Sequence, residues 1–201
     1  MTGRPAALVL AGGSARRLGG IDKPLIAIAG GSLLERILTA IAPQAAPIAL
    51  SANGDPSRFA RFGLPVLDDG TFLGHGPLAG LLAGLDWAAT HGAEALLTVP
   101  GDTPFIPANL AARLAPAPAC AMSAGRTHHL VALWPVAARV ALRRFLGTPG
   151  PRGVRHFAAA IGMRKVDFPV VAWDPFCNVN TQEDLAEARA LAERMRTGGE
   201  P

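Results

Sequence analysis

The stretch that decides the fold is Ala-Ala-Leu-Val-Leu-Ala-Gly-Gly-Ser-Ala-Arg-Arg-Leu-Gly-Gly-Ile-Asp-Lys, residues 6–23. Its first five residues are continuously apolar, which is typical of a strand that is buried on both faces of a parallel sheet. A pair of glycines then ends the strand, and a loop with three basic residues follows. Because open parallel sheets bind their ligands at the carboxyl ends of the strands, the stretch predicts a buried strand that leads into a binding loop.

The loop after this strand has the composition of a phosphate-binding loop. Gly12 and Gly13 let backbone N–H groups approach an anion closely. Arg16 and Arg17 offer planar guanidinium groups, and Lys23 adds a charge on a flexible stem. The glycine spacing fits neither GxxxxGK[ST] nor GxGxxG, which disfavours P-loop NTPases and dinucleotide-binding dehydrogenases. From the residues alone, an arginine-bearing surface turn remains the alternative.

The rest of the chain alternates short apolar runs with segments of helical periodicity. We expect strands at 47–51, 65–67, 95–99, 119–123 and 130–134, and helices at 33–41, 77–90, 135–146 and 181–195, with a short helix after Pro107. Ser32 and Glu35 form the signature of a capping box before the first helix. The alternation predicts βαβ units. We therefore expect a single three-layer, Rossmann-like α/β domain with a mostly parallel central sheet at residues 1–196, and a flexible tail at 197–201.

The composition of the 201 residues excludes several classes of protein. Hydrophobic residues make up 50% of the chain and charged residues 17%, which excludes intrinsic disorder as the main state. Cys120 and Cys177 stand alone, so a zinc ribbon and a disulfide scaffold are excluded. The net charge of +4 is too modest to indicate a nucleic-acid partner.

Membrane and export signals are also weak. The apolar run from Ala6 to Ala11 is too short for a signal peptide. No apolar stretch approaches the roughly 20 residues of a membrane span. We therefore expect a cytoplasmic protein that binds neither membranes nor nucleic acids.

Small or polar residues also follow the apolar runs at 47–51 and 95–99. The first run ends in Ser51-Ala-Asn53, and the second is followed by Pro-Gly-Asp102. In a parallel sheet, Asp102 would face the same crevice as the glycine-rich loop. Mg²⁺ prefers one or two carboxylates together with phosphate oxygens and water, so Asp102 is a candidate metal ligand. The alternative is an aspartate that caps the following helix.

Four motifs together resemble those of the molybdenum cofactor guanylyltransferases, which make molybdopterin guanine dinucleotide. They are LAGGSARRLGGIDK at 10–23, GPLAG at 76–80, PGDTPF at 100–105 and NVNTQEDL at 178–185, in the order and spacing of that family. The double glycine after Ala11 differs from the LAAG that is usual in cytidylyl and sugar-nucleotidyl relatives. The resemblance implies a nucleotidyltransferase fold and the transfer of GMP from GTP to the phosphate of molybdopterin, with release of pyrophosphate.

The resemblance also implies roles for individual residues. In the related enzymes the aspartate of the PGDTPF motif holds Mg²⁺, which assigns Asp102 to the metal, while Arg17 and Lys23 would stabilise charge on the triphosphate. Asn53 and Asp69 match positions assigned to GTP, and a guanine edge needs acceptors of this kind. The alternative for Asp69 is a solvated acidic turn together with its neighbour Asp68. The residues implied to bind the nucleotide are Leu10, Ala11, Gly12, Gly13, Lys23, Ser51, Asn53, Asp69, Gly80 and Asp102. For Gly80, close packing of a helix against the sheet is an equal alternative.

The acceptor site rests on fewer signals. His128 and His129 are adjacent without a third metal ligand nearby, so we expect a loop that contacts the pterin rather than a zinc site. Arg152 lies in the basic run 151–156, which could hold the acceptor phosphate or be a solvated helix start. By resemblance, Asn180 lies near the metal or the acceptor phosphate. Its alternative is a cap on the final helix.

Two rival functions remain open at this point. One is a nucleotidyltransferase of the same fold that uses CTP, or that transfers to a sugar 1-phosphate. The other is a non-catalytic GTP-binding protein that delivers the cofactor and would not need Asp102. The resemblance favours an enzyme with GTP and molybdopterin as substrates and Mg²⁺ as cofactor. It also suggests molybdoenzymes or cofactor-handling proteins as partners.

Overall fold

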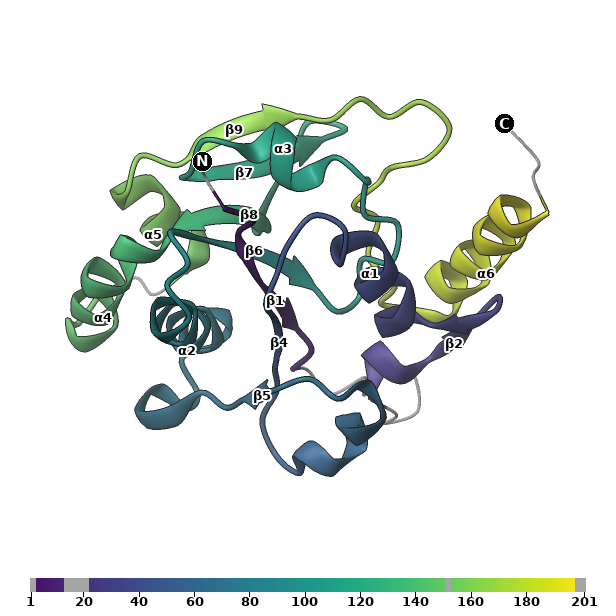
Figure 1. Cartoon of the computed structure of the whole chain (residues 1–201). Coiled ribbons are helices and arrows are strands. Elements are labelled where there is room, and N and C mark those ends of the chain that lie inside the picture. Colours follow the sequence, from purple (N-terminus) through teal and green to yellow (C-terminus); the bar gives the residue numbers. More distant parts are fainter. Residues whose placement is uncertain (1–2, 13–21, 151–152, 198–201) are drawn as a thin grey trace.

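The fold is built around a seven-stranded sheet, seen in a computed structural model that describes residues 3–12, 22–150 and 153–197. The strand order is β5-β4-β1-β6-β8-β7-β9 (Figure 1). The strands are β1 (Ala6–Leu10), β4 (Ile48–Ser51), β5 (Val66–Leu67), β6 (Ala95–Pro100), β7 (Ala119–Ser123), β8 (Arg126–Pro135) and β9 (Arg164–Asp167). Among these strands, β8 alone runs antiparallel to its neighbours. The prediction of a mostly parallel sheet is therefore confirmed.

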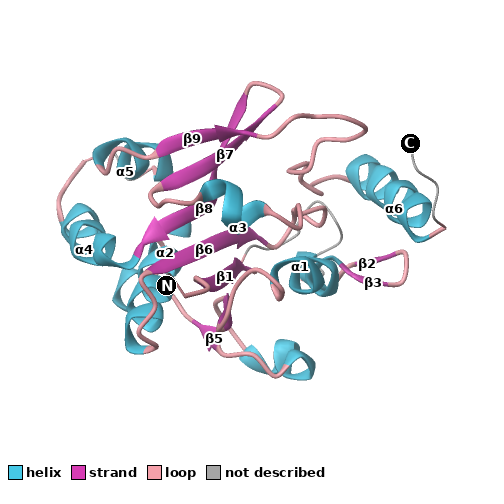
Figure 2. Ribbon diagram, turned by 45° about the horizontal axis from the view of Figure 1, so that its top comes forward, coloured by secondary structure: helices cyan, strands magenta, loops and turns pink. Residues whose placement is uncertain are grey.

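Helices cover both faces of this sheet, which gives the expected three layers (Figure 2). One face packs against α1 (Leu33–Ile41) and α3 (Leu110–Leu114), and the other against α2 (Pro77–Thr90), α4 (Arg139–Gly147) and α5 (Val154–Ala160). The last helix, α6 (Gln182–Arg196), packs near the two-stranded ladder of β2 (Ala27–Ile28) and β3 (Gly31–Ser32). Short 3-10 segments are η2 (Lys23–Leu25), η3 (Pro56–Phe62), η4 (Gly70–Phe72) and η5 (Val136–Ala138). None of the helices in the described part of the chain has the length and apolar character needed to cross a membrane.

The apolar run of β1 is explained by burial on both faces. Ala7 and Val9 contribute to the core beneath α1 and α3, while Ala6 and Leu8 contribute to the core beneath α2. All four side chains are fully buried. Because successive residues of a strand point to opposite faces, a central strand needs apolar residues at every position.

The predicted elements agree with the structure except near β8. The helix at 33–41 has its capping box from Ser32 and Glu35, and the helix at 77–90 has the predicted bounds. The strand expected at 130–134 instead begins at Arg126, because it pairs with β7 as a hairpin. The histidine pair therefore lies within a strand, and the expectation of a histidine loop is wrong. The helix expected at 135–146 is divided into η5 and α4.

The parallel register brings several strand ends to one edge of the sheet. Leu10, the last residue of β1, lies opposite Ser51 of β4 and opposite Pro100 of β6. Ser51 in turn lies opposite Leu67 of β5. The segments that follow these strands therefore emerge side by side.

Gly101 lets the ends of β1 and β6 approach closely. Its backbone N–H donates to the carbonyl of Leu10 at 2.9 Å. A Cβ at this position would lie 3.0 Å from Cγ of Pro24, 3.1 Å from the Leu10 carbonyl oxygen and 3.2 Å from Cα of Ala11. Two of these three atoms belong to the backbone, so a larger residue would have to move the strand ends apart.

We predict that Gly101→Ala lowers the free energy of unfolding by about 1–2 kcal/mol. Overpacking costs about 1–3 kcal/mol, and the smaller entropy of the unfolded alanine chain offsets part of this cost. Gly12→Ala is the matched control, because its Cβ would meet atoms of β4 and of the residue after it at 3.8 and 3.9 Å, an ordinary contact. Denaturant unfolding of both variants measures the difference, and equal stabilities would contradict the steric argument.

Candidate active site

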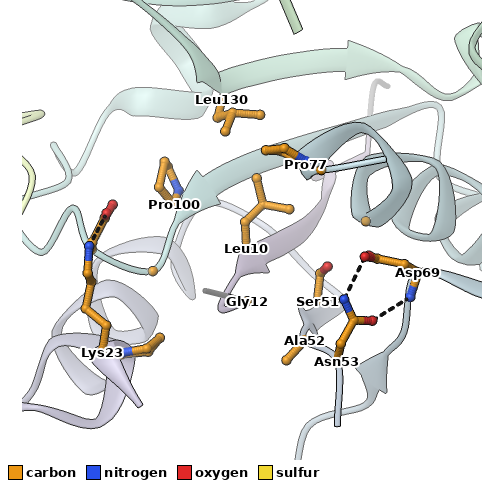
Figure 3. A pocket seen from close by; sticks show the side chains of 15 residues that line it. Leu10, Gly12, Lys23, Ser51, Ala52, Asn53, Asp69, Pro77, Pro100 and Leu130 are labelled. Carbon is orange, nitrogen blue, oxygen red and sulfur yellow. Dashed lines mark hydrogen bonds and ion pairs between the residues drawn. The ribbon is translucent and has the colours of Figure 1, made fainter. Parts of the chain in front are cut away.

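A cavity of about 450 Å³ opens at the edge where these strand ends meet (Figure 3). It lies at the carboxyl ends of β1, β4 and β6, beside the N-terminus of α2. The residues that line it are Leu10, Gly12, Lys23, Pro24, Ser51, Ala52, Asn53, Asp69, Gly76, Pro77, Gly80, Pro100, Gly101, Asp102 and Leu130. Its position is the one that open α/β sheets commonly use to bind ligands.

One side of the cavity holds an ammonium group between two oxygen ligands. Nζ of Lys23 lies 3.1 Å from Oδ2 of Asp102 and 2.5 Å from Oδ1 of Asn180. The side chains of Lys23 and Asp102 are each 19% exposed, so the ion pair is partly shielded from water. Three segments that are distant in sequence thus meet at one cation.

Neither oxygen ligand is used as a helix cap. The side chain of Thr181 caps α6 by accepting from the backbone N–H of Asp184, and the carboxylate of Asp184 accepts in return from the N–H of Thr181. Asn180 gives only its backbone N–H to this carboxylate, at 2.7 Å, and its side-chain amide oxygen accepts from Lys23. Asp102 stands in the turn after β6 and is not the N-cap of any helix in the described residues.

The other side of the cavity holds a reciprocal pair of side chains. Nδ2 of Asn53 donates to Oδ2 of Asp69 at 2.6 Å, and the backbone N–H of Asp69 donates to Oδ1 of Asn53 at 3.0 Å. Figure 3 shows this pair across the cavity from Lys23. Arg58 holds the same loop by donating to the backbone carbonyl of Asn53 at 2.7 Å. The Asp69 carboxylate is therefore oriented by the protein.

Gly80 brings α2 against this pair. A Cβ on Gly80 would lie 2.3 Å from Oγ of Ser51 and 3.5 Å from Oδ1 of Asp69. The helix thus approaches the end of β4 too closely for any side chain in the present arrangement. Gly80 also lines the cavity. The close packing of α2 on the sheet is therefore observed, and the same residue is also placed where it could contact a ligand.

The structure brings together most of the residues predicted to bind the nucleotide. Those that line the cavity are Leu10, Gly12, Lys23, Ser51, Asn53, Asp69, Gly80 and Asp102. Ala11 is buried beside them, and its N–H donates to the Ser51 carbonyl at 2.9 Å. Gly13, Arg17 and Arg152 fall outside the described residues.

The two histidines predicted to bind the acceptor are not among the described residues that line the cavity; their neighbour Leu130 is. Nε2 of His128 lies 2.8 Å from Oγ of Ser123. Burial lowers the pKa of His128 below its usual range, although the carboxylate of Asp174 opposes this shift. Burial also lowers the pKa of His129, and the nearby positive charges of Lys165 and Arg155 lower it further. Both imidazoles are therefore mainly neutral at pH 7.

Several lining residues were not among the predicted site residues. Pro77 and Pro100 lie within the quoted motifs, so the motifs themselves pointed to them. Leu130 carries no comparable signal, because an apolar residue in a strand is ordinarily assigned to the core. It reaches the cavity where the pairing of β7 with β8 changes register, and such irregularities re-aim side chains.

The oxygen ligands around Lys23 also have the chemistry of a divalent metal site. Asp102 and Asn180 supply a carboxylate and an amide oxygen, and both face a cation already. Within the described residues no cluster of three or more His, Cys, Asp or Glu side chains could hold a metal. A metal here would need further oxygen ligands from phosphate and water, which is the coordination that Mg²⁺ prefers.

Known proteins share the sequence family and the fold of this chain. Residues 7–164 match the family described as MobA-like NTP transferase domain. A crystal structure of molybdopterin-guanine dinucleotide biosynthesis protein A from Archaeoglobus fulgidus has a TM-score of 0.71 at 21% identity, covering 94% of this chain and 100% of that one. At this identity the likeness supports the fold. The family match and the fold together define the protein as a nucleotidyltransferase.

Closer relatives identify the branch of that class. A protein from Acidiphilium cryptum (strain JF-5) is 59% identical, covering 92% of this chain and 93% of its own length. One from Rhodopseudomonas palustris (strain BisB5) is 50% identical, covering 96% and 98%. Both are named molybdenum cofactor guanylyltransferase. The chain belongs to the molybdenum cofactor guanylyltransferase family.

The lowered histidine pKa values predict that the protein loses stability in mild acid. An unfolded histidine has a pKa of about 6.5. Because the folded pKa values of His128 and His129 lie lower, the unfolded chain takes up protons first as the pH falls below this value. The free energy of unfolding should therefore decrease between about pH 7 and pH 5.

His128→Gln should flatten this decrease, and the double variant with His129→Gln should flatten it further. Denaturant titrations across this range provide the measurement, and an unchanged slope in both variants would contradict the prediction.

Proposed function

We propose that the chain transfers GMP from GTP to the terminal phosphate of molybdopterin. An oxygen of the acceptor phosphate forms a bond to the α-phosphorus, the bond from that phosphorus to the bridging oxygen breaks, and pyrophosphate leaves. The observation that carries the proposal is one cavity with a fixed carboxylate acceptor on one side and the Lys23–Asp102 ion pair on the other, with the amide oxygen of Asn180 in contact with Lys23. Membership of the molybdenum cofactor guanylyltransferase family supports the choice of substrates.

The side with Asn53 and Asp69 suits guanine better than cytosine. The Watson–Crick edge of guanine presents two neighbouring donors, N1–H and N2–H₂, which match the two oxygens of a carboxylate. Cytosine presents one donor and two acceptors on that edge, and a carboxylate would repel the acceptors. The Asp69 carboxylate is held by Asn53, and we therefore assign it to the guanine edge, with Ser51 and Gly80 beside the base or its ribose.

The side with Lys23 suits the triphosphate. Gly12 and Gly13 would offer backbone N–H groups, and Lys23 with Arg17 would neutralise the oxygens of the leaving pyrophosphate. We assign Asp102 and Asn180 to a bound Mg²⁺, which supplies positive charge to the phosphate oxygens when bound. Holding the reactants in line and stabilising charge are sufficient for phosphoryl chemistry, so no serine or cysteine nucleophile is required.

The acceptor would enter from the side of β8, where Leu130 lines the cavity. Leu130 offers an apolar surface to a pterin. His129 is the preceding residue of β8, and the charges of Lys165 and Arg155 lie near it. Arg152 remains our proposal for the acceptor phosphate.

Since GTP is drawn from the cytoplasmic pool, we also propose a cytoplasmic location, with molybdoenzymes or cofactor-handling proteins receiving the product.

We predict that Asp102→Asn lowers kcat for pyrophosphate release from GTP and molybdopterin by at least about 100-fold. The variant keeps the shape of the side chain and loses the charge that opposes Lys23 and holds the metal, and a transition-state interaction of this type contributes several kcal/mol. Asp86→Asn is the matched control, because Asp86 of α2 is not among the described residues that line the cavity and its carboxylate pairs with Arg143 of α4. Near-normal turnover by Asp102→Asn would reject the site assignment. GTP binding by wild type without pyrophosphate release would favour the non-catalytic alternative.

A second prediction tests the base assignment with inosine triphosphate, which lacks the 2-amino group of GTP. Wild type should prefer GTP over inosine triphosphate by about 10-fold or more in kcat/KM, since a hydrogen bond to a charged group is worth about 1.5–3 kcal/mol. Asp69→Asn should lose most of this preference, because an amide presents one acceptor instead of two. Assays with CTP, ATP and UTP complete the comparison. A GTP preference that survives in Asp69→Asn would show that another group reads the base.

A further inference from the structure

A second polar cluster lies outside the cavity, at the far end of the β7–β8 hairpin. Ser123 is the last residue of β7 and is fully buried. Its hydroxyl donates to Oδ1 of Asp174 at 2.7 Å and lies 2.8 Å from Nε2 of His128. A serine hydroxyl has one proton, and here Asp174 receives it. The His128 nitrogen must therefore be the donor to Ser123, which fixes the tautomer with hydrogen on Nε2.

The cluster has the residue types of a hydrolytic triad and a different connectivity. In such a triad the carboxylate accepts from the histidine and the histidine accepts from the serine. Here the carboxylate accepts from the serine, and the serine oxygen is buried. Ser123 therefore has neither a base nor access to a substrate, and the cluster is not a nucleophilic site.

Asp174 instead organises the segment that follows it. Its Oδ1 accepts from the backbone N–H of Phe176 at 2.9 Å, and its carbonyl accepts from the N–H of Cys177 at 3.2 Å. The ring of Phe176 is buried and packs against the rings of Phe168 and His128, with centroid distances of 5.0 and 5.2 Å. One carboxylate oxygen thus joins the end of β7 to a tight turn in segment 174–180.

The same segment reaches the candidate active site at its other end. Asn178 accepts through Oδ1 from the hydroxyl of the buried Thr103, at 3.2 Å. The N–H of Val179 donates to the backbone carbonyl of Asp102 at 2.9 Å. Asn180 then places its amide oxygen on Lys23. Segment 174–180 is therefore attached to the hairpin at one end and to the turn of the candidate metal ligand at the other.

We propose that Ser123 and Asp174 are positioning residues for the transfer reaction, because they anchor segment 174–180 so that Asn180 stays beside Asp102 and Lys23. The proposal rests on the function assigned above. Neither residue is among those that line the cavity in the described part of the chain, so both act through the segment. His128 completes the anchor by donating to Ser123, and its role is then in this cluster rather than in direct contact with the pterin.

The test compares two variants of Asp174. Asp174→Ala removes the acceptor for Ser123 and Phe176, and we expect kcat for pyrophosphate release to fall about 10–100-fold, since a misplacement of about 1 Å can cost 100-fold. Asp174→Asn keeps an oxygen at Oδ1 and should retain kcat within about 3-fold. The KM for GTP should change less than about 3-fold in both, because the base side is built by other loops.

The matched control is Asp167→Ala. Asp167 is an exposed aspartate and the last residue of β9, where it pairs with Met122, the neighbour of Ser123 in β7. Removal of its side chain should leave kcat unchanged. Ser123→Ala should also lower kcat. If Asp174→Ala fails to fold, the kcat of Ser123→Ala is compared with that of wild type instead.

Amide hydrogen exchange gives a readout that does not depend on turnover. In Asp174→Ala, exchange at Val179 should accelerate at least about 10-fold, while exchange at the buried β1 amides stays at the wild-type rate. Wild-type exchange at Val179 would overturn the proposal, as would an equal acceleration of Val179 and β1, which indicates global destabilisation. A kcat within 3-fold of wild type in Asp174→Ala would also overturn it. If wild type itself releases no pyrophosphate, the proposed function fails, and the exchange data alone then decide whether segment 174–180 is anchored in this way.

Discussion

The constraint on which the site depends is the parallel register of β1 with its two neighbours. Leu10 is level with Ser51 on one side and with Pro100 on the other. Because of this register, the loops after β1, β4 and β6 begin at the same level of the sheet. A shift of one strand would move Asn53 relative to Asp102. Gly101, which has no Cβ, permits this spacing between β1 and β6, and its N–H holds it by donating to the carbonyl of Leu10. The cavity is thus a consequence of how the sheet is assembled.

Opposite charge then unites loops that the sheet only brings near each other. The ammonium of Lys23 is partly buried and contacts oxygens from two other segments. Withdrawing a charge from water is costly unless it is paired, so the aspartate and the asparagine keep the lysine at the cavity wall. A nucleotide would enter a site whose cationic and anionic groups already neutralise each other.

Much of the fold was predictable from the sequence. The apolar run of β1, the capping box of α1 and the period of α2 are local patterns, and each follows from a few neighbouring residues. Residues such as Lys23 and Asp102 were found because each follows a strand end within a recognisable motif. The β9 strand was not predictable, because Arg164–Asp167 is short and polar and becomes a strand only by pairing with β7. The contact between Ser123 and Asp174 was hidden for a similar reason: 51 residues separate them, and no local pattern specifies such a contact.

The reciprocal bonds between Asn53 and Asp69 have a consequence for the thermodynamics of recognition. Two side chains that would otherwise sample several rotamers are held in one arrangement before any ligand arrives. Their loss of conformational entropy therefore belongs to the folding of the chain and is not subtracted from the binding free energy. A base that matches the fixed carboxylate gains nearly the full interaction. A mismatched base finds a rigid partner that cannot rearrange to accept it.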